Sequence, residues 1–133
     1  MTEKERREQV ESYYGKLIKI EFDRPVGTRH EKHGNAWVYP INYGYIPNVL
    51  GGDGEELDVY LLGVYTPIEK PCTVKIVGGV FRADDDEDKL LAVLPDASIP
   101  SEADAAKEVA FHNGPTYFAN PNNLDKFYSK TSD

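Results

Sequence analysis

The stretch Asp53-Gly54-Glu55-Glu56-Leu57-Asp58-Val59-Tyr60-Leu61-Leu62 joins an acidic turn to an apolar strand. Four carboxylates fall within its first six residues, and the glycine lets the backbone bend sharply beside them. The apolar residues that follow have the composition of a strand. Several carboxylate oxygens are thereby fixed at the end of a rigid element, which is how hard divalent cations such as Mg²⁺ are bound. A metal site is therefore the preferred interpretation of this stretch, and a merely solvated turn is the alternative.

A second acidic cluster, Asp84 to Asp88, lies between two apolar runs of strand length, 77–81 and 90–94. The pattern predicts a hairpin whose loop carries five adjacent negative charges, and that repulsion must be offset by water or by bound cations. For the charge run by itself, a solvated hairpin tip is the simpler interpretation. Lys89 directly after the acids favours a negative ligand, such as a phosphate held over metal ions.

Other strands extend the pattern on both sides. Residues 16–22 alternate charged and apolar side chains with a period of two, as a half-buried strand does. Further strands are expected at 57–63, 73–81 and 89–94. Short strands in succession without βαβ alternation predict an α+β, mainly β fold, a five-stranded OB-like barrel, closed or partly closed, with flanking helices. Such a barrel would bring the turn at Asp53 and the hairpin at Asp84 to one opening.

The remaining segments are predicted to be helices and turns around this barrel. An accessory N-terminal helix occupies residues 1–15 and stops at Gly15, and a second helix begins with Ser101 as N-cap and runs to about His112. His112 is interpreted as a favourable partner of the helix dipole. We expect a polar turn at 29–35 and one or two closing helical turns at 124–130. No composition break divides the chain, so residues 1–133 are expected to form one domain.

Charge and cysteine content limit the classes of function. The chain has 15 Lys and Arg against 23 Asp and Glu, a formal net charge of -8, and no basic stripe that could follow a nucleic-acid backbone. Nucleic acid is therefore not an expected partner, and a phosphate ligand would have to be attracted by cations already bound. Cys72 is the one cysteine, so no intrachain disulfide can form. Without a signal peptide or an apolar run of membrane-spanning length, we expect a cytoplasmic protein with no membrane partner.

The residues just described resemble the family I soluble inorganic pyrophosphatases, of which the chain looks like a short member. The resemblance covers residues 16 to 94 and is strongest at Tyr39-Pro40-Ile41-Asn42-Tyr43-Gly44-Tyr45-Ile46, at 53–59 and at 84–93. The family signature around the first acidic stretch is met at all but the third place, where Glu55 stands in place of an aspartate. The resemblance implies hydrolysis of pyrophosphate to two phosphates by metal-activated water, with Mg²⁺ or alternatively Mn²⁺, and a homo-oligomer.

The same resemblance implies roles for the acidic residues. Asp53 and Asp58 match the signature metal ligands, and Glu55 stands where the family has the acid that takes the proton of the attacking water. Asp84 and Glu87 stand nearest the other two metal-binding aspartates. The adjacent Asp85 and Asp88 are the alternatives under a shift of one residue.

The substrate side of the site is implied in the same way. Lys89 matches the phosphate-binding lysine and Tyr43 the active-site tyrosine, both with catalytic roles, while Tyr39 lines the site. Glu21 matches the first-strand acid that holds metal-bound water. The chain is shorter than the family between Glu21 and Tyr39, so Arg24, Arg29 and Lys32 are phosphate-binding candidates by chemistry and neighbourhood. Tyr117 and Lys126 are stand-ins for a late tyrosine and lysine of the family.

Three functions are compatible with this pattern. The first is an inorganic pyrophosphatase. The glutamates at 55 and 87 and the shortened segment raise a second, a related metal-dependent phosphohydrolase acting on another phosphate ester or anhydride. The third is a catalytically silent barrel that binds metal or phosphate. His30 and His33 could instead hold a transition metal, although two histidines three residues apart outside a helix are a weak signal.

Overall fold

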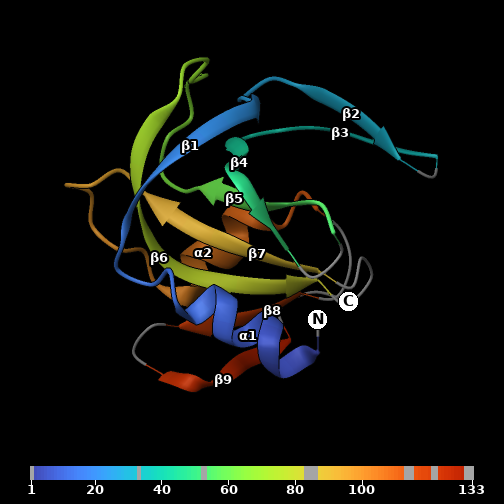
Figure 1. Ribbon diagram of the computed structural model, residues 1–133. Coiled ribbons are helices and arrows are strands. Elements are labelled where there is room, and N and C mark those ends of the chain that lie inside the picture. The colour runs from blue at the N-terminus through green and yellow to red at the C-terminus, as the bar shows by residue number, and fades with distance from the viewer. Residues whose placement is uncertain are drawn as a thin grey trace.

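Five strands close into a barrel in the computed structural model (Figure 1), which describes residues 2–32, 34–51, 54–82, 87–112, 116–120 and 123–130. In order around the barrel they are β1 (Leu17–Arg24), β4 (Asn42–Leu50), β5 (Glu56–Leu61), β7 (Glu87–Val93) and β6 (Cys72–Arg82). β6 then pairs with β1 and completes the ring. β5 and β7 are parallel, and the other pairs are antiparallel. The OB-like barrel predicted from the sequence is confirmed.

Strand alternation sorts the side chains into two apolar clusters. One receives residues from all five barrel strands and is therefore the interior; it contains Ile20, Ile46, Leu57, Val59, Leu61, Val74, Ile76, Leu90 and Ala92. The other lies on the outer face of β4, β5, β6 and β7, where Tyr43, Tyr60 and Leu91 pack with Ala105 and Val109 of helix α2 (Glu102–Val109). Because β5 is covered on both faces, its outward positions can hold polar groups in a partly dry environment.

The two predicted helices are confirmed. Helix α1 (Glu3–Glu11) begins with a capping box between Thr2 and Glu5, and it contacts β6 and β7. Ser101 caps α2 by accepting a hydrogen bond from the backbone N–H of Asp104. Neither helix in the described part of the chain combines the length and the apolar character needed to cross a membrane.

Two expectations about the connecting segments are wrong. Residues 29–35 do not form a simple polar turn, because β2 (Arg29–Lys32) and β3 (Asn35–Val38) make a hairpin that projects from the barrel (Figure 1). Gly34 has the positive φ of 80° that the reversal uses, and the cross-strand rings of His30 and Trp37 lie 5.1 Å apart.

The predicted helical turns at 124–130 are likewise absent, since β9 (Asn123–Lys130) is a strand that pairs with β8 (Thr116–Asn120). The long strand β6 explains this difference. Its first residues pair with β1, and its last residues, Gly79 to Arg82, pair with β8 beyond Leu17, where β1 begins. The C-terminal hairpin thus pairs with the edge of β6 that β1 leaves open.

A close approach of β4 to β1 requires glycine at position 44. A Cβ atom on Gly44 would lie 2.0 Å from the backbone carbonyl oxygen of Glu21, a distance that no relaxed side chain tolerates. Tyr43, its neighbour on β4, is paired with Arg24 at the end of β1. The absence of a side chain at 44 therefore lets the two strands carry Tyr43 and Arg24 to the same place.

Candidate functional site

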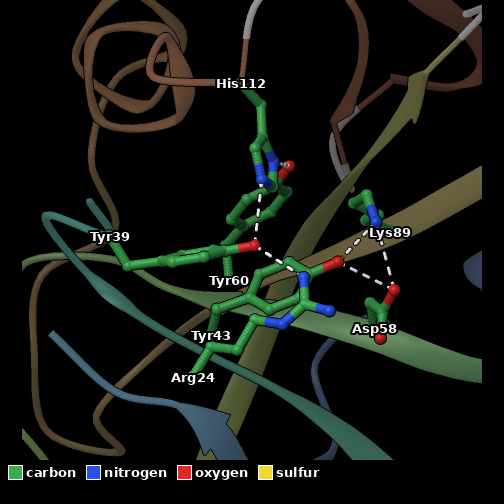
Figure 2. Close-up of polar contacts among 7 residues, drawn as sticks. All are labelled: Arg24, Tyr39, Tyr43, Asp58, Tyr60, Lys89 and His112. Carbon is green, nitrogen blue, oxygen red and sulfur yellow. Dashed lines mark hydrogen bonds and ion pairs between the residues drawn. The ribbon is translucent and has the colours of Figure 1, made fainter. Parts of the chain in front are cut away.

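A lysine, a tyrosine and an aspartate from three adjacent strands meet on the outer face of the barrel (Figure 2). Lys89 on β7 donates from Nζ to Tyr43 Oη at 2.5 Å and to Asp58 Oδ2 at 3.1 Å. Tyr43 on β4 donates from its hydroxyl to the same Asp58 oxygen at 2.7 Å. The Lys89 side chain is 4% exposed and that of Asp58 is 27% exposed. The cation is thus buried against its partners, while the carboxylate reaches solvent.

The electrostatics of this group keep the phenol protonated. Burial raises the pKa of Tyr43 well above its ordinary value, the Lys89 charge offsets part of that rise, and the Asp58 carboxylate adds to it. Tyr43 is therefore a hydrogen-bond donor at neutral pH. Among the described residues both hydrogen bonds to the Asp58 carboxylate use Oδ2, and carboxylate oxygens are the ligands that hard divalent cations take in proteins.

Arg24 and Tyr39 stand beside this group. Arg24 Nη1 donates to Tyr39 Oη at 2.8 Å, and the guanidinium carbon lies 5.7 Å from the ring centre of Tyr39 and 5.8 Å from that of Tyr43. This geometry combines a hydrogen bond with two cation–π contacts. The structure therefore brings together five of the residues named from the sequence: Arg24, Tyr39, Tyr43, Asp58 and Lys89.

Acidic side chains continue the same face of the sheet away from Lys89. Glu21 is paired with Tyr45, and Tyr45 is paired with Asp58, so the three lie in one cross-strand row. Asp23, which sequence reasoning did not single out, belongs to this neighbourhood. Burial raises its pKa, and the nearby Asp58 carboxylate raises it further against the opposing effect of Arg24. Carboxylates next to two cationic side chains suit a ligand made of metal ions and an anion.

Other predicted residues lie elsewhere. Arg29 and Lys32 are on the projecting hairpin, where Arg29 Nη2 pairs with Glu31 Oε1 at 2.7 Å and both side chains are 63% exposed. Lys32 is exposed at the hairpin end and is paired with Asn35. Glu55 is exposed, and its carbonyl accepts the Gly51 N–H in the turn before β5.

The second acidic cluster is described in part. Asp53, Asp84 and Asp85 lie outside the described residues, and Glu87 is described only as the first backbone position of β7, paired with Arg82. Asp88 is buried and lies 3.9 Å from Arg6 Nε of α1, which disfavours it as the shifted metal ligand. Within the ranges that the structure describes, no three His, Cys, Asp or Glu side chains are grouped closely enough to hold a metal ion.

Sequence reasoning missed two polar side chains that organise the site. Asn42 is fully buried; its Oδ1 accepts the backbone N–H groups of Val26 and Ile68, and its Nδ2 donates to the Thr66 carbonyl, each at 3.0 Å. It ties the segment after Arg24 to the loop after β5. His112 contacts two tyrosine hydroxyls rather than serving only the helix dipole. The Asn-Tyr-Gly-Tyr motif was a signal for Asn42; nothing in the local pattern pointed to His112.

Comparison with known proteins decides the family. A family model described as inorganic pyrophosphatase matches residues 9–130. The chain belongs to the inorganic pyrophosphatase family. An inorganic pyrophosphatase of Campylobacter jejuni is 35% identical over 106 residues, which are 74% of this chain and 59% of the relative. One from Saccharolobus solfataricus is 42% identical over 71 residues, or 50% of this chain and 40% of the relative.

Solved structures of the family support the barrel. The crystal structure of an inorganic pyrophosphatase from Neisseria gonorrhoeae superposes with a TM-score of 0.61 at 23% identity, covering 81% of this chain and 84% of that one. At this identity the likeness concerns the fold. The chain thus keeps the family barrel although it spans little more than half the length of the curated relatives that it matches first, 59% and 55%.

Proposed function

We propose that this protein hydrolyses inorganic pyrophosphate to two phosphates with water activated by divalent metal ions. Membership of the inorganic pyrophosphatase family supports the proposal. The observation that carries it is the buried Lys89 ammonium, held by Tyr43 and Asp58 beside the Arg24 guanidinium. Two fixed cations next to a solvent-reaching carboxylate form a site for an anion bridged by metal ions.

The chain's oxygen donors fit Mg²⁺ or Mn²⁺, since carboxylate ligands suit both. Asp58, Asp53, Asp84 and Glu87 would hold the ions, and Glu21, in the same cross-strand row as Asp58, would hold water bound to them. When bound, such ions lower the pKa of a coordinated water and neutralise phosphate charge.

The side chains of the site divide the remaining work. Lys89 and Arg24 bind oxygens of the substrate phosphate, and the charge that develops on the leaving phosphate is stabilised there. Tyr43, kept protonated by burial, donates its proton to Asp58 and accepts from Lys89, and so orients the Lys89 ammonium. Glu55 takes the proton from the attacking water, and Tyr39 orients Arg24. We assign Arg29 and Lys32, on the exposed hairpin, to attracting the substrate as it approaches, and not to binding the phosphate that reacts.

Phosphate release tests the proposal. Purified protein is assayed with pyrophosphate, ATP and a sugar phosphate, each with Mg²⁺ and with a chelator. Release from pyrophosphate that requires Mg²⁺ is expected. Preference for an organic phosphate would indicate a related phosphohydrolase, and binding without release under any divalent ion would indicate a silent barrel.

A matched pair of lysine variants ties the activity to the site. Removing a preorganised donor typically costs about 10²- to 10³-fold in rate, so Lys89→Met should lower kcat/KM by that order. Lys19→Met removes an exposed lysine from β1 of the same barrel and should change it less than about twofold. Equal effects of the two variants would refute the assignment of Lys89.

A further inference from the structure

His112 is a buried polar residue for which the catalytic proposal has no use. It follows α2, is 8% exposed, and has hydrogen-bonding contacts at both ring nitrogens. Nδ1 lies 2.5 Å from Tyr60 Oη, and Nε2 lies 3.3 Å from Tyr39 Oη. Figure 2 shows the imidazole bridging the two tyrosines above Arg24.

Aromatic rings hold the imidazole in this position. Five aromatic residues have ring centres 4.4 to 5.6 Å from the centre of the imidazole: Trp37, Tyr39, Tyr43, Tyr60 and Phe111. Helix α2 is itself anchored, because Glu108 Oε1 accepts the Gly63 N–H at 2.7 Å. The imidazole is therefore held rigidly, and the tyrosine hydroxyls that hydrogen-bond to it are restricted in turn.

The hydroxyl of Tyr39 links the imidazole to Arg24. A phenol has one proton to donate and can accept other hydrogen bonds, whereas a guanidinium only donates. Arg24 occupies an acceptor position on Tyr39 Oη. His112 Nε2 then either receives the Tyr39 proton or donates to the oxygen, according to its tautomer. In both arrangements His112 sets the direction in which Tyr39 offers its oxygen to Arg24.

We propose that His112 is a positioning residue that holds the Tyr39 hydroxyl so that Arg24 presents its guanidinium to the substrate phosphate. The inference rests on the proposed function, because it assigns Arg24 to a phosphate. A free arginine side chain loses rotamer entropy when it is fixed in one conformation. The hydrogen-bonded chain from Tyr60 through His112 to Tyr39 restricts Arg24 before substrate binds, so less of this entropy is lost on binding.

The test compares His112→Phe, which keeps an aromatic ring but no nitrogen, with His112→Gln, which restores a donor and an acceptor. Val109→Ala is the control, since it removes aliphatic packing of α2 against the same face of the sheet and no hydrogen-bonding group. A lost hydrogen bond worth about 0.5–1.5 kcal/mol predicts a rise of about two- to tenfold in the pyrophosphate KM of His112→Phe, with kcat nearly unchanged. His112→Gln should recover most of that loss.

A double-mutant cycle and a spectroscopic readout complete the design. In a Tyr39→Phe background, His112→Phe should add nothing to the rise in KM; additive effects would overturn the inference. The Nε–Hε resonance of Arg24, read by NMR without substrate, should shift and exchange faster with solvent in His112→Phe but not in Val109→Ala. An unchanged resonance would also overturn it. If wild-type protein releases no phosphate from pyrophosphate, the proposed function fails, and the resonance still decides whether His112 positions Arg24.

Discussion

Replacing Asn42 by alanine should destabilise the barrel more than any surface change of similar size. The Asn42 side chain is fully buried and makes three hydrogen bonds of 3.0 Å to backbone groups of Val26, Thr66 and Ile68. These groups lie in two different connecting segments. Alanine would leave two N–H groups and one carbonyl without their partner.

The magnitude follows from the number of orphaned groups. A buried donor or acceptor left unsatisfied costs about 1–3 kcal/mol, and water entering the vacated space would recover part of the total. We therefore expect the free energy of unfolding to fall by about 3–5 kcal/mol, out of about 5–15 kcal/mol for an ordinary domain. Because Val26 follows Arg24 by two residues, the variant should also loosen the anion site.

Urea unfolding followed by far-UV circular dichroism measures this loss. Asn35→Ala, on the exposed hairpin, serves as the control and should change the free energy of unfolding by less than about 0.5 kcal/mol. If Asn42→Ala lowers the free energy of unfolding by less than about 1 kcal/mol, the three backbone groups find other partners, and Asn42 does not stabilise the barrel as predicted.

Two further predictions concern packing and pH. Gly44→Ala places a methyl group 2.0 Å from a backbone carbonyl oxygen, whereas the short contacts of Gly79→Ala are with side-chain atoms, Val10 Cγ1 at 2.6 Å and Tyr14 Oη at 3.1 Å. Chemical denaturation should show a loss of about 3 kcal/mol or more for the first variant and a smaller one for the second. Burial raises the pKa of Tyr43, so unfolding releases its proton above about pH 10. The free energy of unfolding should be independent of this group below that pH and fall above it by up to about 1.4 kcal/mol per pH unit, and Tyr43→Phe should flatten the fall.

Each of these has a contradicting result. Equal destabilisation by the two glycine variants would mean that β1 and β4 can separate freely at Gly44. An alkaline stability profile unchanged in Tyr43→Phe would mean that the phenol ionises as readily in the folded protein as in the unfolded chain. The profile need not become flat, since burial also raises the pKa of Tyr14.

The barrel could be predicted because its strands carry their own pattern. Alternating residues in 16–22 and the apolar runs of β5, β6 and β7 mark strands with buried faces. β4 was missed because Gly44, Pro47 and Asn48 all disfavour strands locally, and its pairing with β1 and β5 overrides that preference. The C-terminal hairpin depends on the free edge of β6, which no local pattern reveals.

The site was predictable to the extent that it lies within motifs. Tyr43, Asp58 and Lys89 were named from the sequence, and the structure places them in contact. The hydrogen-bonded chain through His112 could not be predicted, because it joins the segment after α2 to Tyr60 on β5 and to Tyr39 directly after β3. Contacts between segments 52 and 73 residues apart arise from tertiary packing alone.

In the proposed function, metal ions and phosphate meet at the face formed by Asp58, Tyr43 and Lys89. Anomalous diffraction at the manganese edge, from crystals soaked in Mn²⁺ and inorganic phosphate, tests it most directly. We predict a manganese peak about 2 Å from Asp58 Oδ1, with a phosphate oxygen in hydrogen-bonding contact with Lys89 Nζ. Manganese bound elsewhere, with Asp58 and Lys89 touching neither metal nor phosphate, would show that this face is not the active site.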